Sequence, residues 1–118
     1  MAEIPVTIQD VYFDYDKYDI KDDAQPVLKD LAAFLSKNKN TKVVVEGHCD
    51  DRGTDEYNLA LGDKRANAAK EYLVSLGIPS NRIETVSYGE EKPVCKESTE
   101  ECWAKNRRAH FVLAEERR

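Results

Sequence analysis

The sequence lacks any long apolar run, internal repeat or low-complexity segment. No apolar run approaches the roughly 20 residues that a bilayer-crossing helix needs. A signal-peptide pattern is missing too, because Met1-Ala2-Glu3 leads directly into sequence with the character of a folded domain. If the protein is exported, we expect this chain to be a mature portion. A lipid-anchored parent would have lost its lipidated cysteine together with the signal.

An excess of basic residues is also lacking. Eighteen Lys and Arg residues stand against 23 Asp and Glu residues, which gives a net charge of −5. This balance argues against non-specific affinity for nucleic acid or for an anionic membrane. The length of 118 residues, with 41% hydrophobic and 35% charged residues, suits one globular domain spanning residues 1–118. We expect its ends, residues 1–5 and 114–118, to be flexible.

Cysteine is scarce, and the positions of its three occurrences are informative. Cys95 and Cys102 flank a polar loop, and a disulfide between them would fit an oxidising compartment such as the periplasm. The alternative is a pair of unpaired surface thiols. Cys49 follows a strand-like segment, and we expect it to be half buried as a small apolar residue.

The spacing of apolar residues predicts four strands and two long helices. Asp22 or Asp23 is expected to cap the first helix, with Pro26 in its first turn. Thr54 is the expected N-cap of the second helix, and Gly77 its left-handed stop. The predicted strands are residues 6–13, 42–47, 82–88 and 109–113; a short helix is expected over 99–106.

The predicted order β-α-β-α-β-(α)-β indicates an α/β (α+β) fold. Helical crossovers between strands imply parallel neighbours, whereas the last strand can pair antiparallel. The continuous apolar run Val43-Val44-Val45 is typical of a strand that is central in a sheet or covered on both faces. We therefore expect a mixed four-stranded sheet with two long helices packed on one face.

One carboxylate and one guanidinium are predicted to face the same pocket. Asp50 follows the strand that ends at Gly47, and Arg65 lies 65 − 50 = 15 residues later, in the second helix. Such a pair can hold a small zwitterion, with the carboxylate on its ammonium and the guanidinium on its carboxylate. Asn58 and Leu61 share the helix face of Arg65 and are further candidates. Phe13 and Asp14, which end the first strand, are expected to form the opposite wall.

These residues stand in two recognisable motifs. Asp50 ends the segment Gly47-His48-Cys49-Asp50, and Arg65 lies in the segment NLALGDKRA, residues 58–66. The two segments resemble the GHxD and NxxLGxxRA motifs of the OmpA-like family of peptidoglycan-binding domains, most closely the branch of peptidoglycan-associated lipoproteins. The resemblance covers nearly the whole chain, and it extends to further residues: Phe13, Asp14, Asp16, Ile20, Ser87, Tyr88, Gly89, Lys92, Pro93, Asn106, Arg107 and Arg108.

The resemblance implies a non-catalytic module that binds meso-diaminopimelate in the stem peptide of peptidoglycan. Asp50 and Arg65 would contact this ligand, with Phe13 and Asp14 as ligand wall or backbone contacts. No cofactor is implied. The parent would lie on the periplasmic side of the outer membrane of a Gram-negative bacterium, lipid-anchored, in a Tol-Pal type of tether, with a TolB-like periplasmic protein as a further partner. The alternatives are the wall-binding domain of a porin or flagellar stator protein, or a periplasmic protein-interaction module.

Several residues also have purely structural interpretations. Asp50 and Arg65 could pair with each other, and Asn58 could serve only the backbone of the turn. Arg107 and Arg108 are expected to pair with acidic loop residues, while Tyr15 and Tyr18 are expected to pack within their loop. Catalysis by His48 and Cys49 is disfavoured because neighbours on a strand point to opposite faces. The segment 48–51 also lacks the usual ligand spacing of a zinc site.

Overall fold

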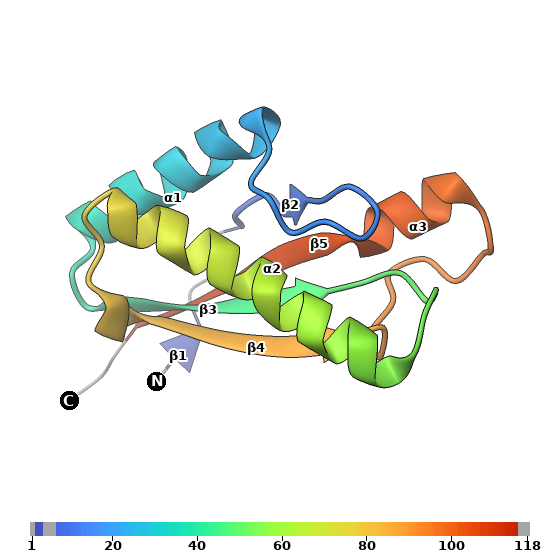
Figure 1. The fold of residues 1–118 in the computed structure, drawn as a ribbon. Helices are drawn as coiled ribbons and strands as arrows, with labels where there is room; N and C mark the ends of the chain where they lie inside the picture. Colours follow the sequence, from blue (N-terminus) through green and yellow to red (C-terminus); the bar gives the residue numbers. More distant parts are fainter. Residues whose placement is uncertain (1, 4–6, 116–118) are drawn as a thin grey trace.

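A computed structural model describes residues 2–3 and 7–115 of the chain. One sheet and two long helices dominate it (Figure 1). The strands are β1 (Ala2–Glu3), β2 (Val11–Tyr12), β3 (Thr41–His48), β4 (Ile83–Gly89) and β5 (Arg108–Glu115). The α-helices are α1 (Gln25–Lys37), α2 (Asp55–Ser75) and α3 (Glu100–Asn106), with short 3-10 turns at η1 (Asp22–Ala24) and η2 (Ser80–Arg82). Among the described residues, no helix has both the length and the apolarity that spanning a membrane requires.

The sheet is mixed, and β3 is central, as expected. Its order is β1-β5-β3-β4, and β2 also pairs with β5. β3 and β4 are parallel, with Val45 opposite Thr85, because α2 carries the chain back across the sheet between them. β5 is antiparallel to β3, with Val45 opposite Phe111. The last strand therefore pairs with β3 and not with β4, its predecessor in the sequence, and it separates β3 from β2.

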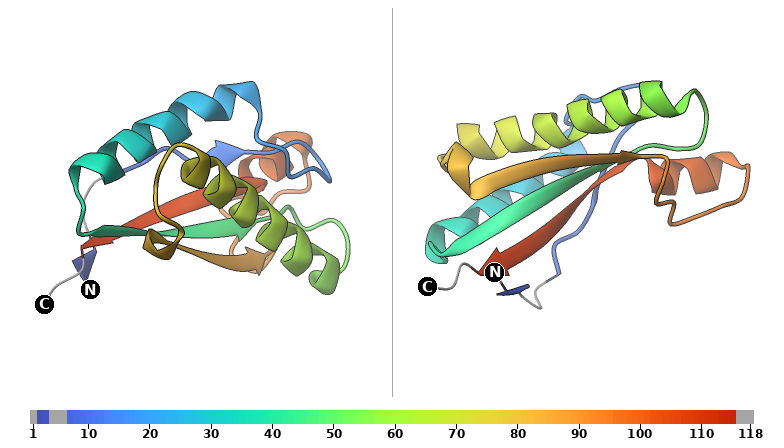
Figure 2. Two further views of the ribbon diagram at one scale, coloured as in Figure 1. Left: turned by 60° about the vertical axis from the view of Figure 1, so that its left-hand side comes forward. Right: turned by 90° about the horizontal axis from the view of Figure 1, so that it is seen from below.

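Both long helices cover one face of the sheet, as expected, and the core lies between the two layers (Figures 1 and 2). Residues in β3 alternate between buried and half-buried, so that Val43 and Val45 face the helices while Val44 faces away. The sheet is thus covered on one face along β3, not on both. The core cluster includes Leu28, Leu31 and Leu35 of α1, Ala66, Ala69 and Leu73 of α2, and Phe111 and Leu113 of β5.

A close approach of backbones sets the position of α2. A Cβ atom on Gly47 would lie 1.7 Å from the carbonyl oxygen of Gly62, and one on Gly62 would lie 2.3 Å from the Ser87 hydroxyl. Only glycine at both positions lets α2 lie directly on β3 at this point. The contact fixes the height of α2 over the end of β3, where Arg65 follows Gly62 by one turn.

The helix ends follow the sequence signals in part. Thr54 caps α2 by accepting a hydrogen bond from Tyr57 N (3.1 Å), and Gly77 has a φ of 101°, both as predicted. At α1 the cap prediction is wrong, because Asp22 and Asp23 lie inside η1 and the N-cap position is Ala24. The 3-10 turn takes the place of a side-chain cap there.

One other prediction about the elements needs correction. The first predicted strand, residues 6–13, is reduced to β2, since residues 7–10 are not in a strand and residue 6 lies outside the described residues. The expected flexible ends fall partly on residues 1, 4–5 and 116–118, which also lie outside, and their flexibility stays a prediction. Within the rest, Ala2 and Glu3 pair with β5, which extends through Glu115.

Candidate functional site

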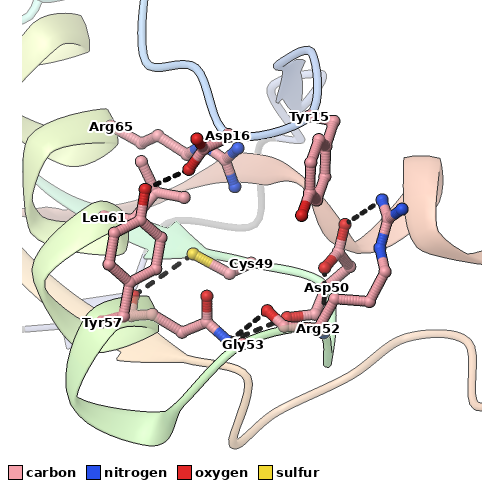
Figure 3. Close-up of a pocket in the computed structure, with 10 residues that line it drawn as sticks. Tyr15, Asp16, Cys49, Asp50, Arg52, Gly53, Tyr57, Leu61 and Arg65 are labelled. Atoms are coloured by element: carbon pink, nitrogen blue, oxygen red, sulfur yellow. Dashed lines mark hydrogen bonds and ion pairs between the residues drawn. The ribbon is translucent and has the colours of Figure 1, made fainter.

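A small pocket of about 50 Å³ lies where the end of β3, the first turns of α2 and the loop after β2 meet (Figure 3). Both Asp50 and Arg65 line it, so the structure brings together the two residues that the sequence paired. Asn58 and Leu61 of α2 line it as well. The complete lining is Tyr15, Asp16, Cys49, Asp50, Arg52, Gly53, Tyr57, Asn58, Leu61 and Arg65.

Asp50 is a buried carboxylate held by two arginines. Its Oδ2 accepts from Arg52 Nη2 (2.8 Å) and Arg107 Nη1 (3.4 Å), and its Oδ1 accepts from the backbone N–H of Arg52 (3.1 Å). Burial acts to raise the pKa of Asp50, but the hydrogen bonds and charges of Arg52, with help from Arg107, outweigh burial and lower it. The carboxylate is therefore ionised at neutral pH.

Arg65 is a buried cation whose partners are backbone carbonyls. Its Nε donates to Lys17 O (2.8 Å), its Nη1 to His48 O (3.0 Å) and its Nη2 to Asp14 O (3.1 Å). The residue is only 1% exposed, and burial lowers the pKa of the guanidinium. No ion pair joins it to a carboxylate in the described residues. A guanidinium has five N–H donors, so the three carbonyls leave one on each terminal nitrogen, and the Cys49 side chain also interacts with the guanidinium.

Asp50 and Arg65 thus do not pair with each other, which excludes the simplest structural interpretation of their spacing. Each has its own partners, and both remain on the wall of one pocket. The arrangement presents an anion held by arginines and a cation that no carboxylate neutralises within the described residues. Such a pocket can accept a ligand that carries an ammonium and a carboxylate.

Asn58 and Leu61 have distinct places in the site. Asn58 is 2% exposed, and its Nδ2 donates to Arg52 O (3.0 Å) and to Glu90 Oε1 (2.9 Å). It therefore ties the turn after β3 to α2 and to the Glu90 side chain that follows β4, which goes beyond the backbone of the turn alone. Leu61 is 7% exposed and provides an apolar part of the wall, as expected.

Phe13 and Asp14 do not line the pocket with their side chains, contrary to the expected opposite wall. Phe13 is buried, with its ring 5.3 Å from the Arg65 guanidinium, and its carbonyl accepts from Arg107 Nε (2.9 Å). The Asp14 carboxylate points to Lys21 (3.1 Å), and only its carbonyl contacts Arg65. Both residues therefore position arginines of the site through their backbone carbonyls.

Tyr15 and Asp16 supply the wall that was expected from Phe13 and Asp14. Tyr57 and Arg52 complete the mouth of the pocket. The Tyr57 hydroxyl of α2 donates to the Asp16 carboxylate, which bridges the mouth (Figure 3). Tyr15, expected to pack within its loop, instead has its ring 4.0 Å from the Arg52 guanidinium. Sequence reasoning missed these residues. The one available signal was spacing: Tyr57 precedes Leu61 by four residues, and Arg52 follows Asp50 by two.

Arg107 and Arg108 pair with acidic residues, as expected. Arg107 Nη2 donates to Glu100 Oε1 of α3 (2.8 Å), and Arg108 Nη1 donates to Asp10 Oδ2 (3.0 Å). Arg107 does more than the sequence suggested, since it also reaches Asp50. It therefore belongs to the support of the pocket.

His48 and Cys49 have separate environments. His48 Nε2 lies 3.1 Å from Glu46 Oε1, whereas the buried Cys49 thiol donates to Asn58 O (3.2 Å). Cys49 is 3% exposed, more buried than expected, and burial raises the pKa of its thiol to about 11. A thiol of this kind is a poor nucleophile at neutral pH. In the part of the chain that the structure describes, no three His, Cys, Asp or Glu residues gather as a metal site would require.

Comparison with known proteins identifies the family behind this geometry. Residues 12–107 match the OmpA family, and this segment contains both the pocket and its supports. The chain belongs to the OmpA family. Its relatives include the peptidoglycan-associated lipoprotein of Rhizobium meliloti (strain 1021), which is 52% identical over 103 residues, or 87% of this chain. The aligned part makes up 58% of that relative, so the chain spans somewhat more than half of its length.

Solved structures of the OmpA fold are similar to this chain. The crystal structure of the peptidoglycan-associated lipoprotein from Burkholderia pseudomallei matches with a TM-score of 0.88 and 43% identity, over 90% of each chain. The C-terminal domain of MotB from Helicobacter pylori matches with a TM-score of 0.84, over 92% of this chain and 86% of that one. At 22% identity, the second match shows the shared fold alone. The expected mixed sheet and its helices are thus confirmed.

Proposed function

We propose that the pocket binds the free amino-acid end of meso-diaminopimelate in the stem peptide of peptidoglycan. The single observation that supports this most is Arg65, a buried cation with N–H groups beyond those that the three carbonyls use and no carboxylate partner in the described residues. The ligand carboxylate would accept from these groups, and the ligand ammonium would donate to Asp50. The names of the peptidoglycan-associated lipoproteins among the relatives support peptidoglycan as the source of this ligand.

The proposed selectivity follows from the same two charges. A lysine-type stem peptide has the ammonium but lacks the second carboxylate. It would leave the buried Arg65 without a counter-ion while filling the pocket, which is costly in a site shielded from water. We therefore expect the domain to prefer diaminopimelate-type peptidoglycan to lysine-type peptidoglycan.

The cellular role that we propose is a non-catalytic tether between the outer membrane and the cell wall. A lipid anchor elsewhere in the parent would hold one end in the outer membrane, and this domain would hold the wall from the periplasmic side. The lipoprotein names of the relatives support such an anchor. The disulfide between Cys95 and Cys102 supports an oxidising compartment.

A TolB-like protein is a second candidate partner, favoured by exposed tyrosines near the pocket. Tyr15 and Tyr57 are 55% and 51% exposed, and Tyr18 of the same loop is 46% exposed. Exposed aromatic side chains of this kind are enriched in protein interfaces. A partner bound over Tyr15 and Tyr57 would cover the pocket, so it would compete with peptidoglycan.

The proposal is tested by co-sedimentation of the domain with purified peptidoglycan of the diaminopimelate and lysine types. The Asp50→Asn variant keeps the shape of the side chain and removes its charge. We expect the parent protein to sediment with diaminopimelate-type peptidoglycan only, and Asp50→Asn to lose most of this binding, about tenfold or more in affinity, because a charge-assisted contact is lost.

Asp63→Asn is the matched control, since Asp63 is an exposed carboxylate of α2 that does not line the pocket. This control should bind like the parent. Equal binding of the parent to both types of peptidoglycan would refute the proposed ligand. Undiminished binding by Asp50→Asn would refute the proposed role of the pocket.

A further inference from the structure

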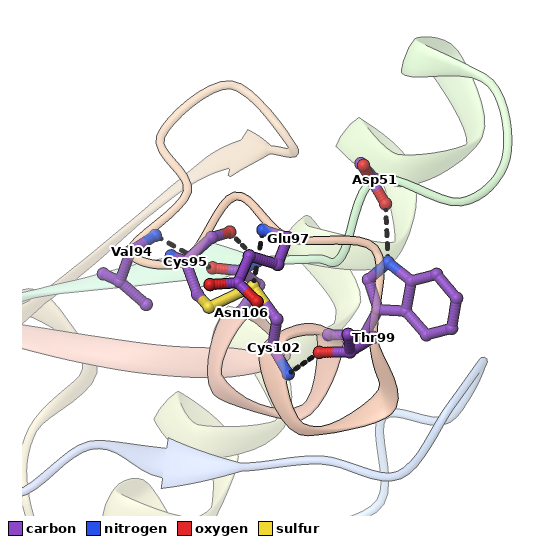
Figure 4. The surroundings of a disulfide bond; sticks show 8 residues. Asp51, Val94, Cys95, Glu97, Thr99, Cys102 and Asn106 are labelled. Carbon is purple, nitrogen blue, oxygen red and sulfur yellow. Dashed lines mark hydrogen bonds between the residues drawn. A yellow bond between two sulfur atoms is a disulfide. The ribbon is translucent and has the colours of Figure 1, made fainter.

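The loop before α3 and α3 itself are fastened to each other at two points (Figure 4). A disulfide joins Cys95 to Cys102, the third residue of α3, with their Cα atoms 5.3 Å apart. The Asn106 side chain accepts from Val94 N (2.8 Å) and donates to Cys95 O (2.7 Å). α3 has only seven residues, too few to be stable as a helix alone. Its conformation therefore depends on these attachments.

α3 in turn contacts the residues that hold Asp50. Trp103 Nε1 donates to Asp51 Oδ1 (2.9 Å), and the Trp103 ring lies 4.1 Å from the Arg52 guanidinium. Arg52 is thus in contact with both Trp103 and the Tyr15 ring while it pairs with Asp50. One turn earlier in α3, Glu100 holds Arg107, the second arginine on Asp50.

We propose that the Cys95–Cys102 disulfide sets the ligand affinity of the pocket by keeping α3 against Arg52 and Arg107. Trp103 is then a positioning residue, because it fixes Arg52 and the turn at Asp51 without lining the pocket itself. Reduction would leave Asn106 as the remaining one of these two attachments, loosen α3 and with it the two arginines, and leave Asp50 less well placed for a ligand ammonium. The inference rests on the proposed function of the pocket.

The redox step is a thiol–disulfide exchange with a dithiol, such as a thioredoxin-like oxidoreductase. A thiolate of the dithiol attacks the Sγ atom of Cys95, the less buried cysteine of the pair, and Cys102 leaves as a thiolate that takes a proton. The second thiolate of the dithiol then displaces Cys95. Two electrons pass to the protein, which ends with two thiols, while the dithiol becomes a disulfide. Cys49 takes no part, because it is buried with a raised pKa.

The single tryptophan makes the proposal directly measurable. The dissociation constant of a diaminopimelate-type muropeptide is measured for oxidised protein and for protein reduced with dithiothreitol. We expect reduction to weaken binding about fivefold, as loss of one net hydrogen bond would, and to shift Trp103 fluorescence. The Cys95→Ser/Cys102→Ser variant should bind as weakly as the reduced protein and ignore dithiothreitol.

Trp103→Ala, which keeps the disulfide, distinguishes this mechanism from a general loss of stability. In the oxidised state it should bind about as weakly as reduced parent protein, and reduction should then add little, because both changes remove the same support. Equal affinities of oxidised and reduced parent protein, or an undiminished effect of reduction in Trp103→Ala, would overturn the inference. Failure of the oxidised parent to bind the muropeptide at all would instead overturn the proposed function.

Discussion

Arg65 has two roles at the scale of a single residue. Its three hydrogen bonds to Lys17, His48 and Asp14 carbonyls join the loop after β2 to the end of β3, and its remaining donors are available to a ligand. The 15-residue spacing to Asp50 allowed either a shared ligand or a direct pair with Asp50, and neither interpretation indicates bonds to backbone carbonyls. The structure shows that the same guanidinium holds the pocket together before any ligand binds.

Removal of the Arg65 guanidinium should destabilise the folded protein. We expect Arg65→Ala to lower the free energy of unfolding by about 3 kcal/mol, because three carbonyls lose a charged donor and a cavity forms. Urea denaturation followed by circular dichroism measures the change. Lys64→Ala, at the exposed neighbouring position, is the control and should change stability little. Equal stability of the two variants would contradict the structural role of Arg65.

His48 is a second residue whose environment has a measurable consequence. It is 1% exposed, its Nδ1 has no hydrogen-bond partner in the described structure, and its Nε2 contacts Glu46. Burial lowers the pKa of His48 from 6.5, with Arg108 and His110 of β5 acting in the same direction and Glu46 opposing them. Tyr88 of β4 packs on the ring at 5.5 Å. The His48 imidazole is therefore neutral in the folded protein at neutral pH.

The sign of the pH dependence follows from this lowered pKa. Unfolded His48 takes up a proton near pH 6.5, whereas folded His48 does so only at a lower pH. The contribution of neutral His48 to the free energy of unfolding is therefore complete above pH 6.5 and is lost as the pH falls. We expect the free energy of unfolding to decline as the pH falls from about 7.5 to about 5.5. The decline is at most about 1.4 kcal/mol for each unit by which the pKa of His48 is lower in the folded than in the unfolded protein. His48→Asn should show a flatter decline over this range, as measured by urea denaturation. Identical slopes for the parent protein and His48→Asn would contradict the assignment of this pH dependence to His48.

At the scale of elements, the contact between α2 and β3 decides where the pocket lies. Gly47 and Gly62 let the helix backbone touch the strand backbone, and Ser87 Oγ of β4 donates to Leu59 O of α2 (2.7 Å). Arg65 and Asn58 are carried on the helix faces that this contact orients. A wider spacing would lift Arg65 away from the His48 carbonyl.

Gly62→Ala tests this contact. The substitution has two opposing effects on the free energy of unfolding. Alanine in a helix is favoured over glycine by about 1 kcal/mol, whereas the added Cβ would lie 2.3 Å from Ser87 Oγ. We expect the overlap to prevail and to lower the free energy of unfolding by about 2 kcal/mol net. Gly62→Ala/Ser87→Gly, which removes the overlapping hydroxyl, should recover part of this loss in a thermal melt. A stabilised Gly62→Ala would show that the helix spacing is not tight.

At the scale of the whole molecule, the site is assembled from segments that lie far apart in the sequence. The loop after β2, the turn after β3, the start of α2 and the junction of α3 with β5 all contribute. They meet because β5 lies between β2 and β3, which brings Arg107 to both Phe13 and Asp50. The order of the strands thus decides which supports the pocket has.

The sequence predicted the parts of this site that depend on local rules. Helical spacing puts Asn58, Leu61 and Arg65 near one face, and the strand-turn-helix pattern brings Asp50 to the same end of the sheet. These residues do line one pocket. The cap at Thr54, the stop at Gly77 and the disulfide were predictable for the same reason, since each depends on residues that are close in the chain.

Only the tertiary structure decided which partners those residues have. Asp50 pairs with Arg107, Arg65 bonds to carbonyls, and Trp103 packs on Arg52, although the spacing of these residues gave no sign of it. The physical reason is that a hydrogen bond or ring contact requires atoms within a few ångströms, and such distances between remote segments follow from strand order and helix height. The sequence determined the charges and the elements that carry them, and the packing of β5 and α2 determined where those charges meet.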